Sequence, residues 1–211
     1  MHDSHDKLLG EVASYYSAKL DQHGQTARGV DWNGEASQWQ RFAQLARLFE
    51  GRTDFSLNDL GCGYGALLDY LATLPARVDY LGIDVSADMI AAAKQRYADA
   101  AHARFTCAAT PARVADFGVA SGIFNLRMGR TDAQWRAYLE DTLDTMDATC
   151  RAGFAFNCLT SYSDPEKMRD TLYYADPCVL FDLCKRRYAT QVALLHDYGL
   201  YEFTLLVRKP Q

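Results

Sequence analysis

Asp59-Leu-Gly-Cys-Gly-Tyr-Gly65 is the stretch of sequence that decides the fold. It begins within a short run of strand formers, Phe55-Ser-Leu-Asn-Asp-Leu60, and leads into an apolar segment, Tyr64 to Leu74, that fits one helix. Glycines at such a junction let the backbone turn sharply, and they let a ligand lie against the main chain without meeting a Cβ. The stretch therefore predicts a ligand-binding loop between a strand and a helix.

Strand and helix patterns alternate from this loop to the C-terminus, which predicts a parallel sheet with helices on both faces. The connection from His196 to Gly199 is too short for a parallel crossover, so the last two strands form an antiparallel hairpin. The expected fold class is α/β, with a seven-stranded, mostly parallel sheet and an antiparallel last strand. Strands are expected at 55–60, 78–83, 104–107, 117–123, 153–156, 191–195 and 201–207, and helices at 64–74, from Ser86 as N-cap, at 132–146 and at 177–188.

The first fifty residues predict an N-terminal helical cap. Two helices are expected at about 5–21 and 34–50, separated by a segment rich in turn formers and with Asn33 as the N-cap of the second helix. We assign residues 1–50 to this cap, acting as a substrate lid, and residues 51–211 to a Rossmann-like core within a single domain.

Composition excludes several classes of partner. The 211-residue chain has a net charge of −5 and no basic run that resembles a nucleic-acid-binding face. No apolar run approaches the ~20 residues that cross a bilayer, so no membrane partner is expected. The polar N-terminus and six cysteines without a C-x-x-C pair indicate reduced thiols in a cytoplasmic protein. Cysteines and histidines also lack ligand spacing, so no metal site is expected.

Two carboxylates flank the glycine loop. Asp59 suits a ligand ammonium better than a phosphate, which it would repel, while the start of the following helix can receive a carboxylate. Asp84 ends the next strand, about 20 residues beyond the loop, where a carboxylate accepts both ribose hydroxyls of an adenosine. Met89 is placed to pack on the adenine. Together they predict an adenosyl amino acid as the ligand.

A dinucleotide is the alternative ligand. Gly61, Gly63 and Ala66 also satisfy the G-x-G-x-x-G/A pattern of NAD-dependent oxidoreductases. Asp59 before the first glycine, Gly65 at the alternate spacing and the C-terminal hairpin favour the adenosyl amino acid instead.

Two stretches of the sequence together resemble motifs I and II of the class I S-adenosylmethionine-dependent methyltransferases. They are Asp59–Gly65 and Tyr80-Leu-Gly-Ile-Asp-Val-Ser-Ala-Asp-Met89. The order of elements from 55 to 207 is similar to that family's sheet, in which the seventh strand inserts antiparallel beside the sixth. The family's usual acidic residue after the third strand is replaced by Cys107-Ala-Ala-Thr110. The resemblance implies an enzyme that converts S-adenosylmethionine to S-adenosylhomocysteine, with a cofactor site formed by Asp59, Gly61, Gly63, Gly65, Asp84, Val85, Met89, Cys107 and Ser121.

Candidate substrate-binding residues lie after the strands and in the cap. Asn125 and Asn157 follow the fourth and fifth strands, where each amide either orients an acceptor or caps local backbone. Tyr162 and Tyr173 belong to an irregular aromatic segment that we interpret as a lid. Tyr16 and Trp32 of the cap are placed to cover the same cleft, or else pack as part of an amphipathic surface.

Three residues are candidates for catalysis: His196, Asn125 and Tyr198. Imidazole titrates near neutral pH and Asp197 is adjacent, although neighbouring residues in a strand point to opposite faces. The predicted reaction is in-line transfer of a methyl group to O, N or S of a small-molecule metabolite, with a base needed only where the acceptor must lose a proton. A non-catalytic methyltransferase-like protein with an aromatic partner surface is the remaining alternative.

Overall fold

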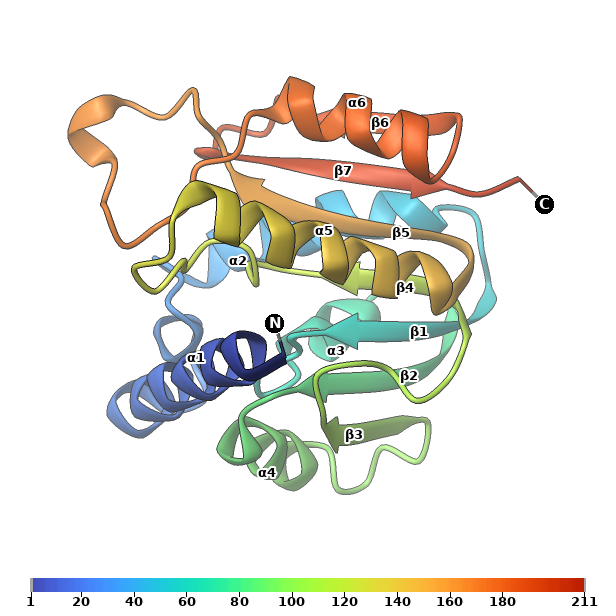
Figure 1. Ribbon diagram of the computed structural model, residues 1–211. Coiled ribbons are helices and arrows are strands. Elements are labelled where there is room, and N and C mark those ends of the chain that lie inside the picture. Colours follow the sequence, from blue (N-terminus) through green and yellow to red (C-terminus); the bar gives the residue numbers. More distant parts are fainter. Residues whose placement is uncertain (1, 211) are drawn as a thin grey trace.

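The computed structural model describes residues 2–210, with side chains from Lys7 to Pro210. Seven strands of this part of the chain form one sheet, which Figure 1 shows with its surrounding helices. The strand order is β3-β2-β1-β4-β5-β7-β6. The strands are β1 (Asp54–Leu60), β2 (Arg77–Asp84), β3 (Ala103–Cys107), β4 (Ala115–Ala120), β5 (Cys150–Leu159), β6 (Gln191–Leu195) and β7 (Glu202–Arg208). The α-helices are α1 (His2–His23), α2 (Glu35–Ala46), α3 (Ala66–Leu71), α4 (Ala87–Arg96), α5 (Asp132–Ala148) and α6 (Pro177–Arg187).

The sheet confirms the predicted mixture of directions. β1 pairs in parallel with both β2 and β4, so that Asp59 lies opposite Gly82 on one side and Val119 on the other. β7 is inserted antiparallel between β5 and β6, as the resemblance implied. Because the carboxyl ends of β1, β2 and β4 meet at one edge, the residues that follow these strands lie side by side.

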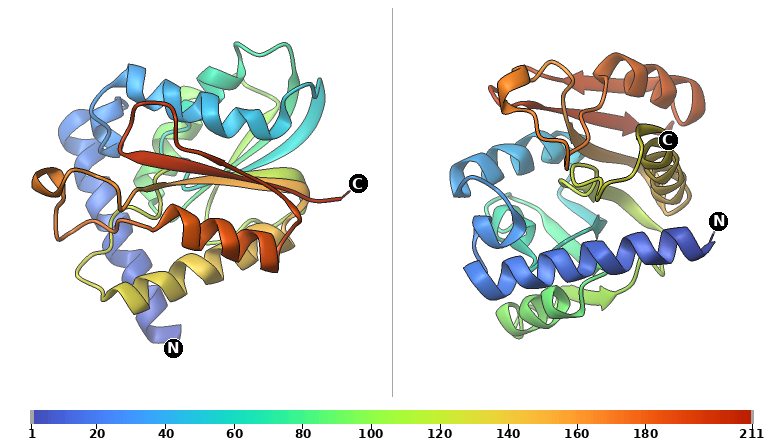
Figure 2. Two further views of the ribbon diagram at one scale, coloured as in Figure 1. Left: turned by 90° about the horizontal axis from the view of Figure 1, so that it is seen from above. Right: turned by 60° about the vertical axis from the view of Figure 1, so that its left-hand side comes forward.

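Helices pack on both faces of the sheet through two apolar clusters (Figure 2). On one face, residues such as Phe42 of α2, Leu67 of α3 and Ile90 of α4 lie against alternate sheet residues such as Leu57. On the other face, Leu139 of α5 and its neighbours pack with α6 against the opposite set of sheet residues. Successive side chains of each strand point to opposite faces of the sheet, so the same strands contribute apolar side chains to both clusters.

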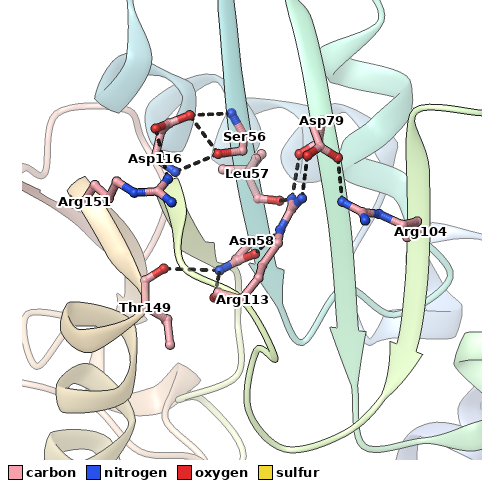
Figure 3. A network of polar contacts seen from close by, with 9 residues as sticks. All are labelled: Ser56, Leu57, Asn58, Asp79, Arg104, Arg113, Asp116, Thr149 and Arg151. Carbon is pink, nitrogen blue, oxygen red and sulfur yellow. Dashed lines mark hydrogen bonds and ion pairs between the residues drawn. The ribbon is translucent and has the colours of Figure 1, made fainter.

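The connection from β3 to β4 is an irregular segment with several bends, 108–114, rather than a helix (Figure 1). Figure 3 shows how Arg113 fastens it to the sheet: its guanidinium donates to the backbone oxygens of Leu57 and Asp79, to Asn58 Oδ1 at 3.0 Å and to Asp79 Oδ2 at 2.6 Å. This attachment fixes the path of the segment whose first residues, 108–110, lie at the carboxyl edge of the sheet.

The two N-terminal helices have different surroundings. α2 packs on β5 and β7 and belongs to the helical layer, whereas α1 lies across the carboxyl edge of the sheet (Figure 2). α1 is fastened by Ser17 Oγ to Ser86 Oγ at 3.0 Å, by Lys19 to Asp31 at 2.8 Å and by Glu11 to Arg130. Among the helices within residues 2–210, none is long and apolar enough to span a membrane.

Several predicted boundaries were wrong. The second helix begins after Gly34, without a side-chain cap from Asn33, and a 3-10 turn, Arg47–Phe49, follows it. The fourth strand was predicted to reach Ile123 but ends at Ala120, because Gly122 turns the chain with a φ of 79°. The helix predicted at 64–74 is confined to α3, since Gly65 still has left-handed backbone. The fifth strand, predicted at 153–156, extends over Cys150–Leu159.

Candidate active site

The loop after β1 requires its glycines. Gly61, Gly63 and Gly65 have φ values of 75°, 54° and 86°, in the left-handed region that side chains disfavour. Gly61 N donates to Ile83 O at 2.7 Å, which ties the loop to the end of β2. A Cβ at position 61 would lie 2.1 Å from Ile123 Cγ2, so close packing also excludes every larger residue there.

Asp84 links this loop to the helix after β2. Its Oδ2 accepts from Gly63 N at 2.9 Å and its Oδ1 from Ser86 N at 2.8 Å, while Ser86 caps α4 through Met89 N as predicted. Burial raises the pKa of the Asp84 carboxyl, and these backbone donors oppose the rise. Each carboxylate oxygen retains capacity for a further hydrogen bond.

Asp59 is 2% exposed at the end of β1. Tyr80 donates its hydroxyl to Asp59 Oδ2 at 2.6 Å. Burial raises the pKa of Asp59 to about 7, the Tyr80 hydrogen bond opposes the rise, and the charge of Asp84 adds to it. A cationic ligand would stabilise the charged form of this carboxyl, because the ion pair would replace the hydration that the carboxylate loses on burial.

A cavity of ≈ 470 Å³ opens at these residues. It lies within the range of about 300–1,000 Å³ that is typical of ligand sites. Leu9, Val12 and Tyr16 line it from α1, which therefore covers part of its opening. The sequence-predicted residues that line it are Tyr16, Trp32, Asp59, Gly61, Gly63, Asp84, Val85, Met89 and Ser121.

Trp32 forms one wall of the cavity and is held by a buried polar chain. The Arg41 guanidinium stacks 3.9 Å from its ring centroid and donates to both carboxylate oxygens of Glu202 at 2.7 Å. Asn157 donates to Glu202 at 3.1 Å and accepts from Gly122 N at 2.7 Å. Gly122 in turn packs against the indole, where a Cβ would lie 2.4 Å from Trp32 Cζ2. The contacts thus form a closed ring that fixes the indole beside the end of β4.

Replacing Gly122 by alanine is expected to displace the Trp32 ring and to lower the free energy of unfolding by about 2–4 kcal/mol, from backbone strain together with overpacking. Gly199→Ala is the matched control, because Gly199 has a similar φ of 71° with no atom within 4 Å of its added Cβ. Urea unfolding measures both losses, and tryptophan fluorescence reports the environment of the indole. Equal losses in the two variants would show that the Trp32 contact contributes nothing.

Two predicted cofactor residues do not line the cavity. Gly65 faces Tyr97 and Phe105, whose rings would lie within 3.0 Å of an added Cβ. A glycine at this position therefore lets these two rings pack against the loop on the side away from the cavity. Cys107 is exposed at the end of β3, with its Sγ 3.6 Å from Val85 O. The neighbouring Ala108, Ala109 and Thr110 line the cavity in its place.

The two predicted asparagines bind groups of neighbouring elements rather than the cavity. Asn157 is fully buried between Gly122 and Glu202. Asn125 accepts from Leu159 N at 3.2 Å through its side chain, and its backbone oxygen accepts from Tyr173 N at 2.8 Å. Neither side chain lines the cavity, and the backbone groups that they bind are 34 and 35 positions away in sequence, so neither is a local cap. Tyr173 lies against the second apolar cluster.

His196, Tyr198 and Tyr162 also lie outside the cavity lining. His196 is exposed after β6, with its ring 5.9 Å from that of Tyr162, which is itself 67% exposed. Tyr198 is buried, with its hydroxyl 3.0 Å from Thr204 Oγ1. Because β5 and β7 separate β6 from β4, this group does not meet the glycine loop. The structure thus gives no support to His196 as the general base.

Sequence reasoning missed four residues that complete the site. Gln38 and Tyr64 line the cavity from α2 and the glycine loop, while Arg41 and Glu202 hold its Trp32 wall. The sequence contained a pattern that could have identified two of them, Gln38 and Arg41. Gln38 and Arg41 share the buried face of α2 with Phe42 and Leu45, and polar residues at such helical spacing need buried partners.

The residues present fit an adenosyl amino acid. Asp84 offers acceptors at the position expected for a ribose, and Asp59 offers a buried carboxyl for an ammonium. Ser121 Oγ is buried at the cavity without a hydrogen-bond partner, so a bound ligand would satisfy it. Val85, Met89 and Ala109 supply apolar contacts of the kind that an adenine requires.

Comparisons with known proteins point in the same direction. Residues 58–151 match the family model described as a methyltransferase domain. A protein of Mycobacterium tuberculosis (strain H37Rv) that carries the provisional name methyltransferase Rv1506c is 63% identical over 163 residues. That alignment covers 77% of this chain and 98% of the relative.

Solved structures share the fold at low sequence identity. A complex titled DhpI-SAM-HEP superposes with a TM-score of 0.65 at 18% identity, covering 96% of this chain and 98% of that one. The N-methyltransferase NodS from Bradyrhizobium japonicum, in complex with S-adenosylhomocysteine, gives a TM-score of 0.64 at 17% identity. That alignment covers 93% of this chain and 99% of NodS.

Proposed function

Because this chain belongs to the S-adenosylmethionine-dependent methyltransferases, we propose that it methylates O, N or S of a small-molecule metabolite. The cavity is the observation that carries this proposal. Residues of α1, Trp32 and the glycine loop line it, which favours an acceptor small enough to enter the cavity over one that docks on an open face. The cytoplasmic location predicted from the sequence remains part of the proposal.

The proposed roles follow from the geometry of the cavity. S-adenosylmethionine supplies, when bound, an electrophilic methyl group on its sulfonium. Asp84 would hold the ribose and Asp59 the ammonium, while Ser121 and Ile123 lie at the end of β4 nearest the reacting atoms. The walls formed by α1 and Trp32 exclude water and keep the acceptor in line. No histidine occurs among the described residues that line the cavity, so the protein contributes orientation rather than a histidine base.

Labelled methyl transfer tests the size of the acceptor. The protein is incubated with methyl-tritiated S-adenosylmethionine and a cell extract that has been divided by ultrafiltration. Unreacted S-adenosylmethionine is removed by chromatography. Label is then expected in other compounds of the low-mass filtrate, and its amount should depend on active protein. Label confined to retained proteins or nucleic acids would contradict a small-molecule acceptor while leaving methyl transfer intact.

Cofactor affinity is expected to depend on pH through Asp59. Its pKa of about 7 means that the free protein carries mostly the protonated carboxyl at pH 6 and the carboxylate at pH 8. An ammonium binds the carboxylate, so affinity for S-adenosylhomocysteine should rise roughly tenfold from pH 6 to pH 8 and level off above. Titration calorimetry at matched ionic strength measures the change.

Two variants assign this pH dependence. Tyr80→Phe removes the hydrogen bond that favours the carboxylate, and should therefore move the rise in affinity to higher pH. Asp59→Asn removes the titrating group and should leave affinity weak and flat over the same range. A pH profile that is unchanged in Asp59→Asn would assign the titration to another residue.

A further inference from the structure

The charged groups of the cavity restrict the acceptor further. Asp59, Asp84 and Asp141 are its charged lining residues, and all three are acidic. Among the lining residues that the structure describes, none is a lysine, arginine or histidine. The described part of the chain, with side chains from Lys7 to Pro210, therefore presents no cationic side chain to a molecule bound in the cavity.

The arginines at the walls of the cavity have counter-charges within the protein. Arg96 lies over the ring of Tyr64, at 5.5 Å from its centroid, and pairs with Asp69 at 2.7 Å. Arg41 touches the Trp32 wall, yet its guanidinium is engaged by both oxygens of Glu202 at 2.7 Å and by Ser37 O at 2.8 Å. Arg130, which holds α1 through Glu11, donates to Met128 O at 2.8 Å. None of these three guanidinium groups is available to neutralise an anionic ligand.

The remaining walls are mostly apolar. Leu9 and Val12 of α1, Phe42 of α2 and Ile123 and Leu126 after β4 line the cavity beside the Trp32 ring. An anion transferred from water to such surroundings without a counter-charge loses its hydration and gains no ion pair. A neutral molecule avoids this loss, and a cation gains from the aromatic ring and from the excess of carboxylates.

Resting on the proposed function, we infer that the methyl acceptor enters this cavity without negative charge, as a neutral or cationic molecule with an apolar body. The cofactor's own carboxylate does not conflict with this inference, because it belongs to the amino-acid end of the cofactor, which the acceptor does not occupy. Carboxylates, phosphates and phosphonates are excluded as the part of the acceptor that lies inside the cavity. An amine satisfies both the charge and the lining residues, and it attacks without a histidine base once it has lost its proton to water and is neutral.

The test uses three analogues of S-adenosylhomocysteine in which a tertiary nitrogen replaces the sulfur. The nitrogen carries a short arm that ends in methyl, ammonium or carboxylate and projects toward the acceptor. All three share the adenosyl and amino-acid parts, so differences in affinity by calorimetry report the acceptor end alone. The carboxylate arm is expected to bind at least about tenfold more weakly than the methyl arm, and the ammonium arm at least as tightly.

A carboxylate arm that binds as tightly as the methyl arm would overturn the inference and leave the methyltransferase assignment intact. Failure of S-adenosylhomocysteine itself to bind would instead overturn the cofactor site on which the inference rests. The two failures are therefore distinguishable within one series of titrations.

Glu202→Gln supplies a second test, since it removes the charge that neutralises Arg41 and keeps the shape of the side chain. In this variant the carboxylate arm should gain at least threefold relative to the methyl arm, while Glu202→Asp, which keeps the charge, should show little change. Thermal melting establishes that each variant is folded. If folded Glu202→Gln showed the same ratio of carboxylate-arm to methyl-arm affinity as the wild-type protein, the role given to the Arg41–Glu202 pair would be wrong. If the variant does not fold, the order of the three affinities in the wild-type protein decides the inference.

Discussion

Arg41→Ala is expected to lower the free energy of unfolding by about 3–5 kcal/mol, because it leaves the Glu202 carboxylate buried without its partner. Glu202 is 1% exposed and receives two hydrogen bonds from Arg41, so water cannot replace the lost guanidinium. The same change removes the cation that stacks on Trp32. Urea unfolding, analysed as a two-state transition, measures the loss.

A double variant separates the cost of an unpaired charge from the value of the pair. Arg41→Met with Glu202→Leu removes both charges and fills similar volume, so it should cost much less than the sum of the single variants. About 1 kcal/mol is expected to remain, because Asn157 loses its acceptor. Single-variant losses below 1 kcal/mol would show that the pair is not electrostatically isolated from solvent.

The fold was predictable because its determinants are local. The glycine loop, the Ser86 cap and the alternation of strands and helices each depend on residues within a few positions of one another. Strand ends were predicted less well. Gly122 ends β4 early because its backbone is fixed by Asn157, which is 35 positions away in sequence. No local pattern contains that contact.

The cofactor half of the site was predictable for the same reason, whereas the acceptor half was not. Asp59 and Asp84 each lie at a strand end beside the glycine loop, where parallel pairing places them together. The Trp32 wall depends on Arg41 and Glu202, which are 161 positions apart. His196 was a sound candidate from its chemistry, but the order β4-β5-β7-β6 places it beyond two intervening strands. Chemistry without the strand order could not show this.

Asp84→Ala is expected to weaken binding of S-adenosylhomocysteine at least about 100-fold. The carboxylate is positioned to accept from the ribose hydroxyls, and two charge-assisted hydrogen bonds are together worth about 3 kcal/mol or more. The variant also removes the acceptor that holds Gly63 N at 2.9 Å, so the glycine loop itself becomes less ordered. Calorimetry at pH 8, where Asp59 carries its charge, measures the loss without interference from that titration.

Two further variants distinguish the ribose contact from general damage near α4. Asp84→Asn keeps an acceptor oxygen for Gly63 N but loses the charge, and should bind with intermediate affinity. Asp88→Ala removes an exposed carboxylate in the first turn of α4, outside the cavity lining, and should change affinity less than threefold. If Asp84→Ala bound the cofactor as tightly as the wild-type protein, the ribose would have to lie elsewhere. Because the Asp84 carboxylate fixes the ribose end of the cofactor in the proposed arrangement, the proposed orientation of the cofactor would then be wrong as well.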